Sequence, residues 1–437
     1  MVKPLEAGFK EMRMEAFPVS TDAVVKKNDK TGVRVLMSIV AAIFMPAMLF
    51  AQENANNNLG ELSSLPYLQG YHESTGKSGV TVYDETAFHP GLNLYCSGHR
   101  PEAGIMDMRG NILHRWTRNI DDLWEGGKAR HQKHWRRVYL YENGDLLAIW
   151  EQLGVIKLDK DSNLLWAKRN EAHHQVTVSG DDKVYVLTQH LKSGKAISKK
   201  RPVLDNYITV LTSDGRFIKE YSLSEAFQQS PYAHFLDQEN GQTDFFHTNS
   251  LQLFDGSLSH ISPLFKKGNV LVAIRNLDTV AIIDLENNEV VWAEDGKENG
   301  LWKKMHDATL LPDGHILLFD NLGNSGAHGR SRVLEYDLFN KEIIWKYDGD
   351  EGRSFDTETC GTSQRLSNGN TLITESEKGR AFEVTNEGNI VWEFYNPYRT
   401  GNENRLVATL FHLHRFEPEY LGWLNDRKPE ISKTGEK

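Results

Sequence analysis

A repeat of about fifty residues is the feature that most constrains how this chain can fold. Each copy has a short strand-like run, an Asn-Gly or Asp-Gly turn, a second strand-like run and, further on, a run that ends in Trp. The two clearest copies are residues 308–345, which begin ATLLPDGHILLFDN, and residues 363–392, which begin SQRLSNGNTLITES. Units of this kind bury their apolar residues against neighbouring units, so the repeat predicts similar units packed side by side.

Six copies can be aligned along the chain, and all are rich in β-branched and aromatic residues between turn-forming residues, a pattern typical of strands. The copies cover residues 79–116, 134–166, 173–221, 247–292, 308–345 and 363–392. The pattern predicts an all-β fold, a six-bladed β-propeller of four-stranded blades around a central channel. A last strand-like run at 406–416 is predicted to return to the first unit and close the ring. A short helix is expected near 223–229. The recurrent tryptophans are expected to pack between units: Trp116, Trp166, Trp292, Trp345 and Trp392.

The N-terminal region is expected to direct export. Four basic residues between positions 26 and 34 precede an apolar run at 35–50, as in a secretory signal. This run is short for a membrane span and contains Pro46. An uncleaved membrane anchor is the alternative. The predicted organisation is a signal or anchor region at 1–51, a linker at 52–78, the propeller at 79–420 and a tail at 421–437. The protein is expected to be periplasmic or secreted, with no membrane span in its mature part.

Charge and cysteine content limit the partners of the chain. A formal net charge of -10 disfavours a nucleic-acid-binding surface, which is normally basic. No P-loop or dinucleotide fingerprint occurs, and no cofactor is predicted. Cys96 and Cys360 would lie in neighbouring units of a closed ring, where an exported protein could form a disulfide between them.

Aligning the turns brings three histidines to one repeat-equivalent position. His174, His247 and His306 each stand at the start of the first strand of a unit. Because first strands line the channel of a propeller, the three imidazoles are predicted to converge at one mouth. His173 is the alternative to His174, since a shift of one residue exchanges the faces of a strand. The second strands are predicted to return to this mouth at Glu151, Gln189, Arg275, Asn321 and Ser376.

Such a mouth suits an anionic ligand. Arg275 is a cation at the end of an apolar strand, and with the imidazoles, Asn249 and Thr362 it can bind an oxyanion. Imidazole is also a competent nucleophile for a transferable group. The main rival is a zinc site built from three histidines. Spacing of the HExxH type is absent, and Arg275 would disfavour a cation, so no metal is predicted.

Several motifs resemble those of bacterial arylsulfate sulfotransferases. They are GVTVYD at 79–84, HHQVTV at 173–178, His-x-Asn-Ser at 247–250 and His-Asp-Ala at 306–308. The resemblance implies an exported six-bladed propeller that moves a sulfuryl group from an aryl sulfate ester to a phenol without a nucleotide donor. Its small-molecule substrates would be the aryl sulfate and the phenol.

The same resemblance implies roles for individual residues. His306 corresponds to the histidine that is transiently sulfurylated. His247, Asn249 and Arg275 correspond to residues around the sulfuryl oxygens, and Thr362, or its neighbour Ser363, to a hydroxyl in the last blade.

The predicted reaction is therefore a ping-pong transfer through His306. His174 would protonate the leaving phenolate and later deprotonate the acceptor phenol. His173 and Asn321 are predicted to help bind the substrate. Strand alternation is expected to point Asp307 away from the channel, and Trp302 is a candidate for stacking on the aryl ring.

Two other functions stay open at this point. One is a non-catalytic propeller that binds sulfated or other anionic ligands, because propellers host many unrelated functions. The other is a metal-assisted hydrolase or lyase, which would lose its activity in a chelator.

Overall fold

The computed structural model describes residues 70–124, 134–192, 202–238, 242–297, 300–326, 328–349, 351–352 and 354–424. All of these residues belong to one compact unit, Ser63–Lys437. The predicted signal or anchor region, most of the predicted linker and the last residues of the predicted tail lie outside the described residues. Over the ranges that are described, no helix combines the length and the apolar character needed to cross a membrane.

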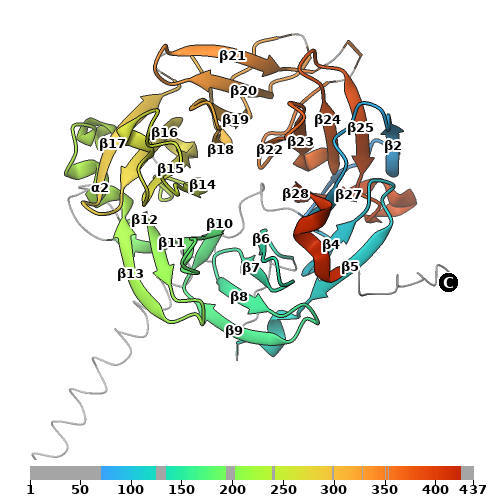
Figure 1. Cartoon of the computed structure of the whole chain (residues 1–437), viewed down its shortest axis with the longest axis horizontal. Coiled ribbons are helices and arrows are strands. Elements are labelled where there is room, and N and C mark those ends of the chain that lie inside the picture. The colour runs from blue at the N-terminus through green and yellow to red at the C-terminus, as the bar shows by residue number, and fades with distance from the viewer. Residues whose placement is uncertain are drawn as a thin grey trace, which may run out of the picture. The chain divides into compact units, whose positions relative to one another are not determined.

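This unit is a ring of antiparallel sheets (Figure 1). From its inner to its outer strand, the first sheet contains β28 (Leu410–Phe416), β3 (Leu92–Ser97), β4 (Glu102–Met106) and β5 (Ile112–Thr117). The second sheet contains, in the same order, β6 (Arg137–Leu140), β7 (Leu146–Trp150), β8 (Gly154–Leu158) and β9 (Leu164–Arg169). The third sheet contains β10 (Ala172–Val178), β11 (Val184–Lys192), β12 (Val203–Leu211) and β13 (Phe217–Ser222).

Three further sheets complete the ring. The fourth sheet contains β14 (Thr248–Leu253), β15 (Asn269–Ile274), β16 (Thr279–Asp284) and β17 (Glu289–Asp295). The fifth contains β18 (His306–Leu310), β19 (Ile316–Asp320), β20 (Arg332–Asp337) and β21 (Glu342–Tyr347). The sixth contains β22 (Thr362–Arg365), β23 (Thr371–Glu375), β24 (Arg380–Val384), β25 (Ile390–Tyr395) and β2 (Gly79–Tyr83). In Figure 1 the first strand of each sheet lies nearest the centre of the ring.

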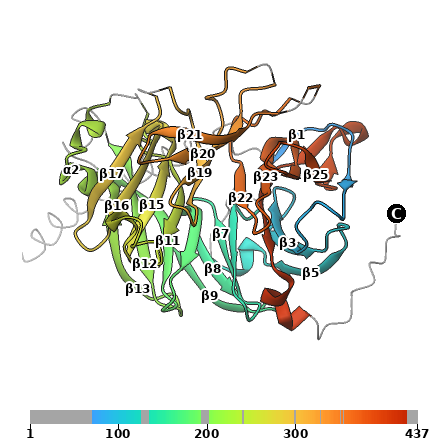
Figure 2. The ribbon, with the colours of Figure 1, turned by 45° about the horizontal axis from the view of Figure 1, so that its top comes forward.

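Helical segments are short and, apart from the last one, lie in the connections between strands. The α-helix α2 (Leu223–Gln228) is capped by the side chain of Ser222, and it fulfils the prediction near 223–229. The 3-10 segments are η2 (Ile120–Asp122), η3 (Ala233–Asp237), η4 (Pro263–Phe265), η5 (Arg275–Leu277), η6 (Ser376–Lys378), η7 (Asn402–Asn404) and η8 (Pro418–Leu424). In the tilted view of Figure 2, η8 is the red segment at the bottom of the picture, and α2 lies on the opposite side, at the upper left.

The C-terminal strand closes the ring. β28 pairs with β3 along its length, for example Leu413 with Tyr95, which confirms the predicted return to the first sheet. The preceding residues behave differently, because β27 (Leu406–Ala408) forms a small separate sheet with β1 (Tyr71–Glu73) and β26 (Arg399–Thr400).

Two predicted boundaries differ from the structure. The first sheet does not begin at Gly79, since β2 pairs with β25 at the outer edge of the last sheet (Figure 1). Its Val80 packs there against the cluster that contains Trp392 and Phe394. The residues at the start of the predicted tail also belong to the fold, because Leu421 is 1% exposed and packs with the first two sheets.

Apolar clusters fill the junctions between neighbouring sheets. β7 shows the principle: Leu146, Ala148 and Trp150 pack toward the first sheet, while Leu147 and Ile149 pack toward the third. This division follows from the alternation of side chains along a strand. Each fully buried aliphatic side chain contributes roughly 1.5–3 kcal/mol, so every sheet is stabilised by both of its neighbours.

The recurrent tryptophans connect adjacent sheets, as predicted. The indole nitrogen of Trp116 donates to the carbonyl of Gly144 in the second sheet at 3.1 Å, and that of Trp392 donates to Met108 in the first sheet at 2.8 Å. Trp166 and Trp345 make the same kind of bond to the next sheet along the chain. Trp302 is 2% exposed and donates to the carbonyl of Asp278, so it packs within the fold and does not offer a ring to a substrate.

Closure by β28 yields a test of the fold. Ending the chain after Thr409 removes β28, leaves β3 as an unpaired inner edge and opens the channel. We expect this variant to lose the cooperative thermal unfolding transition measured by circular dichroism. A chain that ends after Leu424 is the matched control and should melt like the full-length protein. An unchanged transition in the shorter variant would show that closure does not hold the ring together.

Candidate active site

The first strands of three neighbouring sheets are distorted where they begin. His174, His247 and Asp307 have φ angles of 51°, 50° and 52°, in the left-handed region. The pairing of β10, β14 and β18 with their neighbours shifts register at these points. A non-glycine residue in this region costs of order 1–3 kcal/mol, and such strain clusters at functional sites.

Polar side chains bind the backbone at each distortion. The backbone amide of His174 donates to Glu151 at 3.2 Å, and that of Thr248 donates to Asn206 at 2.8 Å. The amide of Ala308 donates to the hydroxyl of Ser250 at 3.2 Å. These bonds hold the distorted conformation, because buried amide groups need a hydrogen-bond partner.

The distortion changes which side chains reach the channel. A bulge interrupts strict alternation, so consecutive side chains can lie on the same side of a strand. His173 and His174 are both buried, and their Nδ1 atoms are 3.0 Å apart. Asp307 lines the channel and forms an ion pair with Arg137 of the second sheet at 2.6 Å, so the expectation that Asp307 points away is wrong.

The structure brings the three predicted histidines together at one end of the channel. The ring centroids of His174 and His247 are 4.8 Å apart. The pKa of His306 is well below its usual value because of burial and then because of the positive charges of Arg275 and Arg136. The pKa of His174 is also well below normal, with burial as the main cause and Arg136 next. Both imidazoles are therefore neutral at pH 7.

The tautomer of His306 follows from its neighbours. Its Nδ1 lies 2.7 Å from Oδ1 of Asn321 and 3.2 Å from the carbonyl oxygen of Lys304. Asn321 is fully buried, and its Nδ2 donates to the carbonyls of Thr357 and Cys360, which fixes the orientation of the amide. Both atoms that face Nδ1 are acceptors, so the proton sits on Nδ1 and the lone pair of Nε2 is available. Asn321 therefore positions the histidine.

His247 is oriented by an aspartate. Its Nδ1 lies 2.5 Å from Oδ2 of Asp244, whose other carboxylate oxygen accepts the backbone amide of His247. Burial favours the neutral form of Asp244, but the contact with His247 outweighs it and lowers the pKa of the carboxyl. The Asp244 carboxylate stays ionised and can balance a positive charge on His247.

The other predicted ligand-binding residues occupy different places. Arg275 lies beside His247, whose carbonyl accepts its backbone amide at 3.3 Å. Asn249 is 5% exposed and donates to the carbonyl of Met305, the residue before His306, at 2.9 Å. Thr362 lines the channel cavity beyond the histidines, together with Asp307. His173 is 1% exposed and lies behind His174.

Three further residues of the site had no predicted role, although Glu151 was predicted to lie at this mouth. Burial raises the pKa of Glu151 to about 7, against the opposing charge of Arg136, and its carboxylate lies 3.1 Å from Nδ1 of His174. Arg136 is buried, with its Nε 3.9 Å from Glu151. Asp244 completes the set. The available signal was position, since Arg136 is the repeat equivalent of the histidines and Glu151 ends a second strand.

The structure does not contain the disulfide predicted between Cys96 and Cys360. Cys96 and Cys360 are both free and buried, although they share one apolar cluster. Burial raises the pKa of the Cys96 thiol to about 12 and also raises that of Cys360.

The chain matches the family described as "Arylsulfotransferase (ASST)" over residues 137–397. It belongs to the arylsulfotransferase family. Membership of the arylsulfotransferase family implies, in general terms, sulfotransferase activity on small aryl substrates. The matched range includes all three histidines, Arg275 and Asn321.

Comparisons with other proteins add less. No curated protein matches the chain. A crystal structure of a protein of unknown function from Bacteroides caccae is 13% identical, covers 74% of this chain and 98% of its own, and has a TM-score of 0.49. A streptogramin B lyase structure is 13% identical, with coverage of 79% and 97% and a TM-score of 0.41. Virginiamycin B lyase from Staphylococcus aureus is 12% identical, with coverage of 60% and 69% and a TM-score of 0.33. These likenesses are too weak to carry an argument.

One group in the candidate site has the residue types of a metal site. Potential ligand atoms of Glu151, His173 and His174 lie within 4.8 Å of one another. However, the two imidazoles face each other through Nδ1, and the Arg136 guanidinium lies 3.9 Å from Glu151. That charge opposes the binding of a cation, so the geometry fits a proton-sharing group better than a metal site.

The orientation of His306 can be tested with Asn321→Asp. A carboxylate beside Nδ1 stabilises the imidazolium, so the pKa of His306 should rise and transfer should slow at neutral pH. The measurement is an NMR titration of ¹⁵N-labelled histidine, with circular dichroism to check folding. Asn389→Asp, on an exposed turn, adds the same charge and should leave His306 unchanged. If the pKa of His306 stayed the same in Asn321→Asp, the hydrogen bond would not determine the state of this ring.

Proposed function

We propose that the chain transfers a sulfuryl group from an aryl sulfate ester to a phenolic acceptor through a sulfurylated His306. The observation that carries this proposal is the bond between His306 Nδ1 and Asn321, which leaves Nε2 as the nucleophilic atom. A pKa well below normal keeps this imidazole neutral, and therefore nucleophilic, across the physiological pH range. Family membership supports the same reaction class.

The first half-reaction forms the N–S bond and breaks the ester. The lone pair of His306 Nε2 attacks sulfur, the bond between sulfur and the aryl oxygen breaks, and a phenolate leaves with that electron pair. In the second half-reaction the acceptor phenol loses its proton and its oxygen attacks sulfur. The N–S bond then breaks and neutral His306 is restored, so no cofactor is consumed.

Cationic and polar groups around His306 support the charge of the sulfate. Arg275 and Arg136 both act electrostatically on His306, and His247 is held by Asp244. Preorganised donors in a buried site stabilise the charge of a transferring group more strongly than water does. Asn249 is the remaining candidate for contact with a sulfuryl oxygen.

Glu151 and His174 form the proposed proton relay. A protonated Glu151 donates to Nδ1 of His174, whose Nε2–H then faces the leaving phenolate. Loss of that proton to the phenolate and return of the proton from Glu151 keep His174 neutral throughout. The pair shares its proton, so its titration belongs to both groups together.

The wider setting of the reaction is also a proposal. We infer that the ring is a six-bladed propeller, which is supported by the six sheets of four or five strands in the described residues. The basic and apolar N-terminal sequence supports export to the periplasm or beyond. Aryl sulfates would then meet the enzyme outside the cytoplasm.

A metal-assisted hydrolase is the second candidate, favoured by the group of Glu151, His173 and His174. It predicts phenolate release that is lost in chelator and restored by a divalent ion. Sulfuryl transfer predicts release that resists chelator and increases with added phenol.

Replacing the nucleophile tests the proposal directly. His306→Ala should lower phenolate release from 4-nitrophenyl sulfate by roughly three orders of magnitude or more, since the covalent route is lost. His260→Ala changes an exposed histidine and should keep full activity. Full activity in a folded His306→Ala variant would exclude the assignment.

The relay predicts a particular pH dependence. Because the pKa of Glu151 is raised to about 7, the relay is loaded below that pH and empties as the pH rises through it. Release from phenyl sulfate, a donor with a poor leaving group, should fall over this range, and Glu151→Gln should flatten the profile. 4-Nitrophenyl sulfate needs little protonation and is the internal control. A phenyl sulfate profile that is identical in the two proteins would contradict the role of Glu151.

A further inference from the structure

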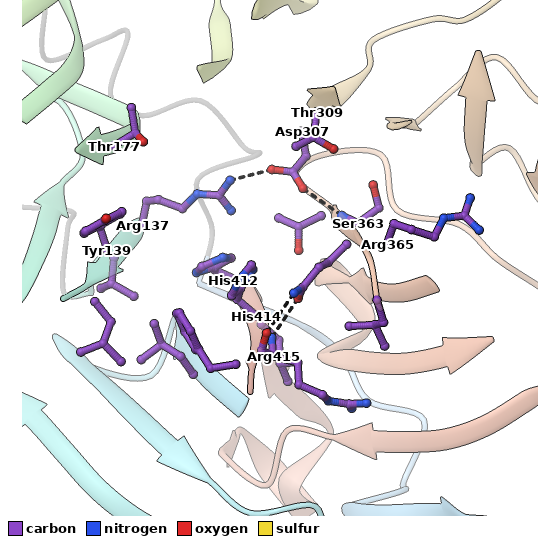
Figure 3. Close-up of a pocket in the computed structure, with 18 of the residues that line it drawn as sticks. Arg137, Tyr139, Thr177, Asp307, Thr309, Ser363, Arg365, His412, His414 and Arg415 are labelled. Carbon is purple, nitrogen blue, oxygen red and sulfur yellow. Dashed lines mark hydrogen bonds and ion pairs between the residues drawn. The ribbon is translucent and has the colours of Figure 1, made fainter. Parts of the chain in front are cut away.

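A second cavity lies in the channel beyond the three histidines. It has a volume of about 800 Å³ and is lined mainly by residues of the first strands β6, β10, β18, β22 and β28 and by residues that follow β28. Figure 3 shows part of this wall. His174, His247 and His306 are not among the lining residues. Because first strands run away from the histidine end, the cavity belongs to the opposite half of the channel. Its size is within the range of about 300–1,000 Å³ typical of small-molecule sites.

A polar bridge crosses the channel at the inner end of this cavity. Arg137 of β6 pairs with Asp307 of β18 at 2.6 Å, and Asp307 also accepts the backbone amide of Ser363 of β22 at 2.9 Å (Figure 3). Arg137 is further bonded to Gln175 of β10. Four first strands therefore meet in one network, which separates the cavity from the groups proposed for sulfuryl transfer.

The cations of the cavity wall are already neutralised. Arg137 pairs with Asp307, Arg365 pairs with Glu335 at 2.6 Å, and Arg415 pairs with Glu383. The imidazole of His414 is neutral at pH 7, because burial and then the charge of Arg137 lower its pKa to about 4. An anionic ligand would find no uncompensated cation here, in contrast to the histidine site.

Uncharged hydrogen-bonding groups remain available on the same wall. The hydroxyls of Tyr139, Thr177 and Thr309 line the cavity and have no hydrogen-bond partner within the described residues, and neither has the ring of His414 (Figure 3). The hydroxyl of Ser363, a residue 5% exposed, is also without a partner. Tyr139, Thr177, Thr309 and His414 are half-buried and only Ser363 is buried, so these groups face the cavity and can hydrogen-bond to a ligand in it.

Apolar surface makes up much of the remaining wall. The apolar residues that line it are Val138, Val176, Leu310, Leu413, Phe416 and Tyr420. Aromatic and aliphatic walls with a few convergent polar groups are typical of sites for small ring-containing molecules.

We propose that this cavity is a second binding site, which takes an uncharged small molecule with a ring-containing apolar body and one or two hydroxyl groups. The body of the ligand lies against the aliphatic and aromatic wall, and its hydroxyls bond to Tyr139, Thr177, Thr309 or His414. The site is separate from the sulfate-binding groups around His306, so it does not require that the proposed transfer reaction be correct.

The test uses 2-naphthol as the probe, titrated against the full-length protein by fluorescence and by calorimetry. The wild-type chain should bind it at the cavity. Thr177→Trp fills the cavity and should abolish this binding, while Tyr139→Phe removes one hydroxyl without filling it and should weaken binding about fivefold. Thr400→Trp makes the same exchange at an exposed position of β26 and should bind as the wild type does.

Two further arms separate the cavity from the histidine site. His306→Ala should keep 2-naphthol binding at the cavity, and Thr177→Trp should keep phenolate release from 4-nitrophenyl sulfate if it folds as judged by circular dichroism. The proposal is wrong if the wild type does not bind 2-naphthol, or if neither Thr177→Trp nor Tyr139→Phe weakens binding. It is also wrong if, in His306→Ala, the anionic 2-naphthyl sulfate binds more tightly than 2-naphthol and Thr177→Trp removes that binding, because a cavity that prefers the anion would contradict the neutralised wall.

Discussion

The left-handed backbone at the start of three first strands is the constraint on which the rest of the site depends. At His174, His247 and Asp307 the chain adopts a φ near +50°, which an ordinary strand avoids. The ring of sheets stabilises this conformation, because each distorted strand is packed on both sides and its backbone is hydrogen-bonded by a neighbouring polar side chain. As a result, consecutive residues such as His306 and Asp307 serve two different parts of the channel.

Burial and charge then determine the chemistry of the histidine end. The neutral imidazoles of His174 and His306 lie near the cations Arg136 and Arg275, an arrangement that supports the proposed nucleophile and the proposed binding of a sulfate. Asn321 and Asp244 fix the Nδ1 atoms of His306 and His247, which leaves both Nε2 atoms for the ligand. Burial raises the pKa of Glu151 to about 7, and in the proposed reaction this carboxyl group is the source of the proton that the leaving phenolate takes up.

Much of the fold and part of the site could be predicted from the sequence. The Trp residues and turn glycines marked the units, and the overlay of those units placed three histidines at one mouth. Strict alternation failed at Asp307, because a bulge cannot be recognised from side-chain type alone. Glu151 was visible only as one of several strand ends, since its raised pKa depends on burial.

The central claim is that His306 carries the sulfuryl group, and trapping that intermediate tests it most directly. The protein would be mixed with 4-nitrophenyl sulfate without acceptor, quenched at alkaline pH and digested for mass spectrometry. The account predicts the added mass of one SO₃ group on the peptide that contains His306, and its disappearance when a phenol is added before the quench. Phenolate release at full rate with no modified peptide, or with the group on another histidine, would contradict it.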